Sequence, residues 1–107
     1  SKQVKEMAEK IINFRMFDGP KGITSSPLKE SDKEILIVSQ FTLAAVTNKG
    51  TKPSFHKAAK PDNAKLLYDK FVTEFRSSFH RVKEGKFGAL MEIELLNKGP
   101  VTYNFKT

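Results

Sequence analysis

Two stretches of the chain place their apolar residues at helical spacing. In residues 2–15 these side chains fall on one face with charged residues between them, and they are Val4, Met7, Ala8, Ile11 and Ile12. The second stretch opens with Pro61 and Asp62, where proline suits the first helical position and the carboxylate complements the helix dipole. Its wider apolar stripe consists of Ala64, Leu67, Tyr68, Phe71, Val72 and Phe75. We predict two amphipathic helices, one over residues 2–15 and one from Pro61 to an end between Ser77 and Gly85.

Other stretches carry the pattern of strands. Residues 35–38 form a short, continuously apolar and mostly β-branched run, which favours a buried strand that continues into the alternating residues 39–43. Residues 89–96 alternate with a period of two, and residues 101–105 alternate again after a turn signal at 97–100. Residues 18–22 predict a turn, while the polar stretches up to residue 33 and from 47 to 54 predict loops. The pattern therefore predicts an α+β fold with two helices and three or more largely antiparallel strands.

Composition narrows the class of protein. A chain of 107 residues is expected to form a single domain, residues 1–107. The absence of cysteine excludes disulfides and thiolate metal sites, and with only His56 and His80 left we expect no metal site. No apolar run is long enough to span a bilayer and no signal peptide is evident, so we expect a cytoplasmic protein without a membrane partner. The formal net charge of +7 favours a polyanionic partner such as nucleic acid, although basic residues also serve solubility alone.

Two short segments carry a family signature. The sequence SQFTL, which runs from Ser39 to Leu43, follows the predicted buried strand, and NKGPVT occupies residues 97–102. In this order and separation they resemble the paired motifs of D-aminoacyl-tRNA deacylases, usually written SQxTL and NxGPxT. The segments between them also resemble the family, at residues 52–55, 61–68 and 85–89, so that the resemblance extends over residues 4–105.

The resemblance implies a fold with a mostly antiparallel, barrel-like β core and two amphipathic helices. Family members begin with a strand carrying an Arg-Val pair and a hairpin, ahead of the segment that matches residues 2–15. Because this sequence has neither, we expect the domain to be N-terminally incomplete.

The reaction that the resemblance implies is hydrolysis of the ester between a D-amino acid, and by extension glycine, and tRNA, without a cofactor. Thr42 could act as a nucleophile assisted by Ser39, but a hydroxyl needs a base and the sequence offers none nearby. The other interpretation is that both side chains only hydrogen-bond the backbone. The resemblance favours a substrate-assisted mechanism in which the ribose 2′-hydroxyl takes part. The backbone N–H groups of Phe41 and Thr42 would then stabilise the oxyanion, and Gln40 would orient the same segment.

The second motif is expected to supply chiral selection. In the family the bond equivalent to Gly99–Pro100 is cis and enters the active site of the other subunit of a homodimer, where rigid carbonyl groups would exclude an L-side chain. By the same resemblance Phe87, Met91 and Ala64 line the pocket for the terminal adenosine and aminoacyl group. From their sequence context alone, Phe87 and Met91 would be core residues.

Four lysines around the central loop are expected to contact tRNA: Lys49, Lys52, Lys57 and Lys60. Each of them taken singly can also be an ordinary solvated charge. The alternative function is a non-catalytic nucleic-acid-binding module, because one branch of the family is described as binding DNA-unwinding elements. That branch usually carries a C-terminal extension, and this sequence stops at Thr107.

Overall fold

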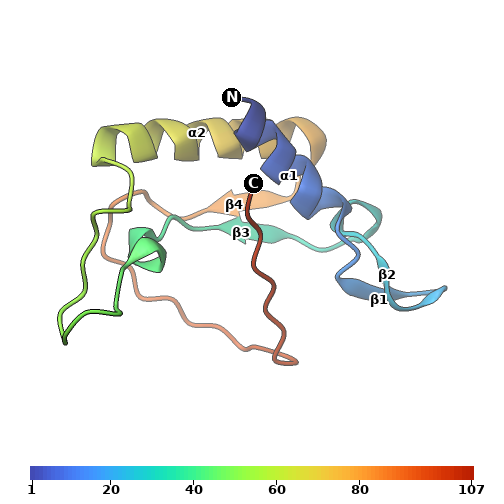
Figure 1. Cartoon of the computed structure of the whole chain (residues 1–107). Coiled ribbons are helices and arrows are strands. Elements are labelled where there is room, and N and C mark those ends of the chain that lie inside the picture. The colour runs from blue at the N-terminus through green and yellow to red at the C-terminus, as the bar shows by residue number, and fades with distance from the viewer.

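The computed structural model describes residues 1–107, and the chain folds as two helices packed beside two small sheets (Figure 1). The helices are α1 (Lys2–Asn13) and α2 (Pro61–Ser78), and the strands are β1 (Phe17–Gly19), β2 (Gly22–Ser26), β3 (Ile35–Ile37) and β4 (Val82–Glu84). Two short 3-10 helices, η1 (Leu28–Glu30) and η2 (Phe41–Ala44), lie in the connections. The α+β class is confirmed.

Both helices form where the apolar spacing predicts them. The Ser1 hydroxyl accepts a hydrogen bond from the Val4 N–H at 3.4 Å and so caps α1. Pro61 occupies the first turn of α2 together with Asp62, and the helix ends at Ser78, inside the predicted window. Local signals determine these ends because a helix satisfies its hydrogen bonds within itself.

The core lies where α1 crosses α2 (Figure 1). Ala8 and Ile12 of α1 meet Phe75 of α2, and Leu28 and Phe79 complete the buried cluster. Phe75 is 0% exposed and its ring lies 6.0 Å from that of Phe79 in an edge-on arrangement. Only seven of the 107 residues are buried, and five of them belong to this cluster, which is therefore the hydrophobic core of the chain.

The strands pair as two separate two-stranded sheets, β1 with β2 and β3 with β4. The prediction of a loop up to residue 33 was wrong for residues 22–26, which form β2 of an antiparallel hairpin around the predicted turn. The prediction of largely antiparallel strands was wrong for β3 and β4, which are parallel. They are parallel because the chain returns through α2, and such a crossover brings the second strand back in the same direction. These four strands do not form the barrel-like β core that the resemblance implied.

The β3 strand stops at Ile37 and is less buried than its sequence suggests. Leu36 is 57% exposed, because α2 covers only one face of the β3–β4 pair. The continuation of the strand into residues 39–43 was also wrong, since Ser39 and Gln40 have no regular structure and η2 begins at Phe41.

The residues that follow β4 form no strand. Residues 89–96 and 101–105 alternate as strands would, yet both are without regular structure. Figure 1 shows this segment leaving β4, running past the sheet without a partner and returning to α1. There the ring of Phe14 packs edge-on against those of Tyr103 and Phe105, at 5.3 and 4.9 Å. Alternation alone cannot make a strand, because its N–H and C=O groups need a neighbouring strand to pair with.

Neither α1 nor α2 combines the length and the apolar character that crossing a membrane would require.

Candidate functional site

A large open groove lies between η2, the start of α2 and the segment that follows β4. It encloses about 1670 Å³, and most of its lining comes from residues 38–48, 55–61 and 87–91. These three stretches are far apart in sequence. They meet because β3 and β4 lie side by side and deliver their following segments to the same end of the sheet. In this parallel pair, as in larger α/β sheets, the carboxyl ends of the strands form the edge of the hollow.

Eight of the residues predicted from the sequence line this groove: Ser39, Gln40, Phe41, Lys57, Lys60, Ala64, Phe87 and Met91. The other five do not line it: Thr42, Lys49, Lys52, Gly99 and Pro100. The groove is therefore shared by the first motif and the expected adenosine pocket, while the second motif lies outside it.

The first motif is held by a short hydrogen bond within itself. The Gln40 side-chain amide donates to the Thr42 hydroxyl at 2.5 Å. Neither histidine bonds Ser39 or Thr42, since His56 pairs with Ser54 and His80 with Arg81. The ring of Phe41 is 61% exposed and meets that of Phe55 edge-on at 5.0 Å. Thr42 thus has a hydrogen-bond partner but no base beside it.

Ser54 and His56 form a pair that the sequence analysis did not identify. An isolated antiparallel bridge between Val46 and Ser54 fixes the backbone here, and the Ser54 hydroxyl lies 2.7 Å from the His56 Nδ1. The only sequence signal was the serine two residues before a histidine, which in an extended segment places both side chains on one face. His56 lines the groove, whereas Ser54 does not.

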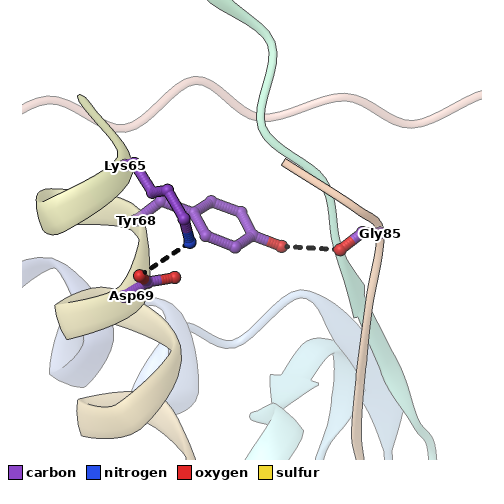
Figure 2. Close-up of polar contacts among 4 residues, drawn as sticks. All are labelled: Lys65, Tyr68, Asp69 and Gly85. Carbon is purple, nitrogen blue, oxygen red and sulfur yellow. Dashed lines mark hydrogen bonds and ion pairs between the residues drawn. The ribbon is translucent and has the colours of Figure 1, made fainter. Parts of the chain in front are cut away.

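Tyr68 is the second residue that the sequence analysis missed as a site residue. It stands in the apolar stripe of α2. Its single O–H proton is shared between two acceptors, the Ile37 carbonyl at 3.1 Å and the Gly85 carbonyl at 3.4 Å. Figure 2 shows the side chain reaching from α2 to Gly85. Its ring lies 5.6 Å from that of Phe87. A tyrosine within an apolar stripe is the signal, since its buried polar tip requires a partner.

The surroundings of Tyr68 keep its hydroxyl protonated. Burial raises the pKa of Tyr68 above 10.0, the charges of Glu84 and Asp69 raise it further, and Arg76 opposes them. The phenol is therefore a hydrogen-bond donor throughout the neutral range.

Lys65 lies beside the expected adenosine pocket. Its ammonium lies 5.8 Å from the centre of the Phe87 ring and 3.0 Å from the Asp69 carboxylate (Figure 2). Lys57 and Lys60 belong to the groove lining itself, whereas Lys65 does not. Lys49 and Lys52 lie in the exposed loop between Val46 and Ser54.

The second motif contains a glycine at a position where any other residue would be strained. The Gly99–Pro100 bond is cis, and Gly99 has φ 155°. A Cβ atom at Gly99 would lie 2.8 Å from the Val101 backbone nitrogen. Both residues are exposed and apart from the groove of their own chain. No group of three or more His, Asp or Glu side chains converges in a way that could hold a metal ion.

A solved structure has the same fold. It is described as c-Myc DNA Unwinding Element Binding Protein, with a TM-score of 0.84 and 39% sequence identity over 94% of this chain and 68% of that chain. The α+β fold, the SQFTL segment in the groove and the exposed cis Gly-Pro bond together define one class of protein. The sequence comparisons identify that class.

Residues 1–106 match the family described as D-Tyr-tRNA(Tyr) deacylase. Proteins named D-aminoacyl-tRNA deacylase are close relatives. The one from Cupriavidus metallidurans is 42% identical over 106 residues, covering 94% of this chain and 68% of the relative. The one from Francisella tularensis subsp. novicida is 45% identical over 101 residues, covering 94% and 70%. The chain belongs to the D-aminoacyl-tRNA deacylase family, a family of hydrolases.

Proposed function

We propose that this protein hydrolyses the ester linking D-amino acids, and glycine, to tRNA, as a chiral proofreading step of translation in the cytoplasm. The observation that carries the proposal is the match of residues 1–106 to the family, with relatives of that name 42% and 45% identical. The groove supports it, because it joins the SQFTL segment to Phe87 and Met91 in one open hollow.

The chemistry proposed is substrate-assisted. An aminoacyl ester is already activated, so positioning and oxyanion stabilisation matter more than a strong nucleophile. The N–H groups of Phe41 and Thr42 open η2, where the first N–H groups of a helix lack partners within it. They would bind the developing oxyanion while the ribose 2′-hydroxyl assists. The missing base beside Thr42 supports this mechanism over a covalent one.

Chiral selection is proposed to come from Gly99 and Pro100 of a second subunit in a homodimer. Their exposure outside the groove of their own chain supports action in trans. A backbone wall close to the substrate α-carbon would admit hydrogen but not an L-side chain, so glycine would be accepted together with every D-amino acid.

The base and ribose of the terminal adenosine would rest against Phe87, Met91 and Ala64. Lys57 and Lys60 in the groove, with Lys49 and Lys52 in the loop beyond it, would contact the phosphates of the tRNA.

A direct assay tests the proposal. The protein is incubated with D-Tyr-tRNA, L-Tyr-tRNA and Gly-tRNA at matched concentrations, and ester loss is followed with time. We expect rapid loss of the D-ester and the glycyl ester and spontaneous loss only of the L-ester. Equal loss of the D- and L-esters would contradict the chiral filter.

A second function is favoured by one observation, the likeness to a protein described as binding a DNA unwinding element. The net charge of +7 suits either nucleic acid. A non-catalytic binding module would bind D-Tyr-tRNA or DNA without any ester loss in the same assay.

A further inference from the structure

The Tyr68 hydroxyl lies where two segments that line the groove, one after β3 and one after β4, diverge from each other. Ile37 is the last residue of β3, and Gly85 follows the last residue of β4. The Gly85 N–H donates to the Ile37 carbonyl at 2.9 Å, and no backbone hydrogen bond joins the two segments beyond this one. The Tyr68 hydroxyl bonds to the carbonyls of both residues. It therefore links α2 to the ends of both strands where the following segments diverge, and Figure 2 shows the contact with Gly85.

Each of these carbonyls stands just ahead of a segment of the groove. Ser39 begins two residues after Ile37, and Phe87 follows two residues after Gly85. The space beside Gly85 is closely filled, since a Cβ there would lie 3.2 Å from the Met91 Cε and 3.5 Å from the Val38 Cγ2. A shift of Gly85 would therefore be transmitted to Met91 as well as to Phe87.

We propose that Tyr68 is a positioning residue, whose hydroxyl sets the distance between the Ser39–Thr42 segment and the Phe87 and Met91 side chains. The inference rests on the proposed function, in which the first segment holds the oxyanion and the second holds the terminal adenosine. Tyr68 acts through the backbone of both segments and touches no reacting atom.

The two parts of the side chain have separable roles. The ring contacts Phe87 and would persist in a Tyr68→Phe variant, so the surface offered to the adenosine is retained. Only the hydroxyl joins the carbonyls of Ile37 and Gly85. Its loss leaves the groove in place but relaxes the spacing between the bound ester and the oxyanion donors. Misplacement of this kind affects the transition state more than the bound substrate.

The chain provides a matched control, because Tyr103 is its only other tyrosine. The Tyr103 ring packs against Phe14, and its hydroxyl has no hydrogen-bond partner in the chain. Tyr68→Phe and Tyr103→Phe remove the same atom, one from the point of divergence and one from the surface.

The experiment measures kcat and KM for D-Tyr-tRNA with the parent chain and both variants, at a temperature where circular dichroism finds all three equally folded. We expect Tyr68→Phe to lower kcat roughly tenfold with KM within threefold of the parent value, and Tyr103→Phe to change neither. A merely structural role would leave kcat per folded molecule unchanged. Amide hydrogen exchange at Gly85 is measured on the same proteins, and we expect at least tenfold faster exchange in Tyr68→Phe alone.

The outcomes separate this inference from the proposed function. If the parent is active and kcat of Tyr68→Phe falls less than threefold, the positioning role is refuted while the function stands. A fall of threefold or more, absent from Tyr103→Phe, supports it. If the parent hydrolyses no ester, the proposed function fails, and unchanged exchange at Gly85 would then overturn the attachment through Tyr68 as well.

Discussion

Two of the lysines that line the groove, Lys57 and Lys60, offer a quantitative test of tRNA recognition. Lys57 and Lys60 lie in the groove, whereas Lys5 on α1 and Lys21 at the turn between β1 and β2 do not line it. Figure 1 shows the β1–β2 hairpin far from the start of α2. The double variant Lys57→Gln/Lys60→Gln and the control Lys5→Gln/Lys21→Gln both reduce the net charge by two. Any difference between them reports position and not total charge.

The expected magnitude follows from counterion release. For single-stranded nucleic acid, such as the end of tRNA, the slope of log K against log salt concentration is about −0.7 per neutralised phosphate. Loss of two phosphate contacts should therefore make the slope shallower by about 1.4 and weaken binding by roughly 25-fold at 0.1 M salt. Lys60 precedes α2 and its side chain caps nothing, so its replacement should not unfold the helix.

The assay is fluorescence anisotropy with labelled tRNA between 50 and 200 mM salt. We expect the control variant to bind within about twofold of the parent, since distant surface charges are screened beyond a Debye length of roughly 10 Å. Equal weakening in both variants would refute a localised contact and leave only a diffuse electrostatic attraction. Unchanged affinity in both variants would show that Lys57 and Lys60 do not contribute to tRNA binding.

Three further outcomes test the site and the fold. Thr42→Ala removes the acceptor of the Gln40 hydrogen bond. It should keep kcat within about tenfold of the parent value, because a single neutral hydrogen bond contributes only about 1 kcal/mol. A loss of several orders of magnitude would instead identify Thr42 as a nucleophile. Phe75→Ala should lower the free energy of unfolding, measured in urea, by about 3–5 kcal/mol, whereas Leu66→Ala on the exposed face of α2 should lower it far less. Similar losses in the two variants would show that the core does not lie around Phe75. The pKa of Tyr68 is raised on folding, so its contribution to stability is complete below pH 10.0 and is lost as the pH rises through the higher folded value. The parent should consequently lose more stability than Tyr68→Phe in thermal melts above pH 10.0, and parallel losses would contradict the burial of the phenol.

The sequence predicted the helices and the family because both depend on local information. The apolar stripe of α2 and the proline at its start specify a helix whose hydrogen bonds are internal. The SQFTL and NKGPVT segments likewise identify the family from a few contiguous residues. Eight of the thirteen predicted site residues then proved to line one groove.

What the sequence left open depends on partners distant in the chain. The alternation of residues 89–96 is that of a strand, but no strand lies beside it, and a strand without a neighbour cannot satisfy its backbone. The parallel pairing of β3 with β4 required the return of the chain through α2, which no local pattern encodes. The position of Tyr68 arises in the same way. Its place in the apolar stripe could be read from the sequence, but only the tertiary fold brings its hydroxyl to the carbonyls of Ile37 and Gly85. Ile37 ends β3 and Gly85 directly follows β4, and the two meet only because these distant strands pair.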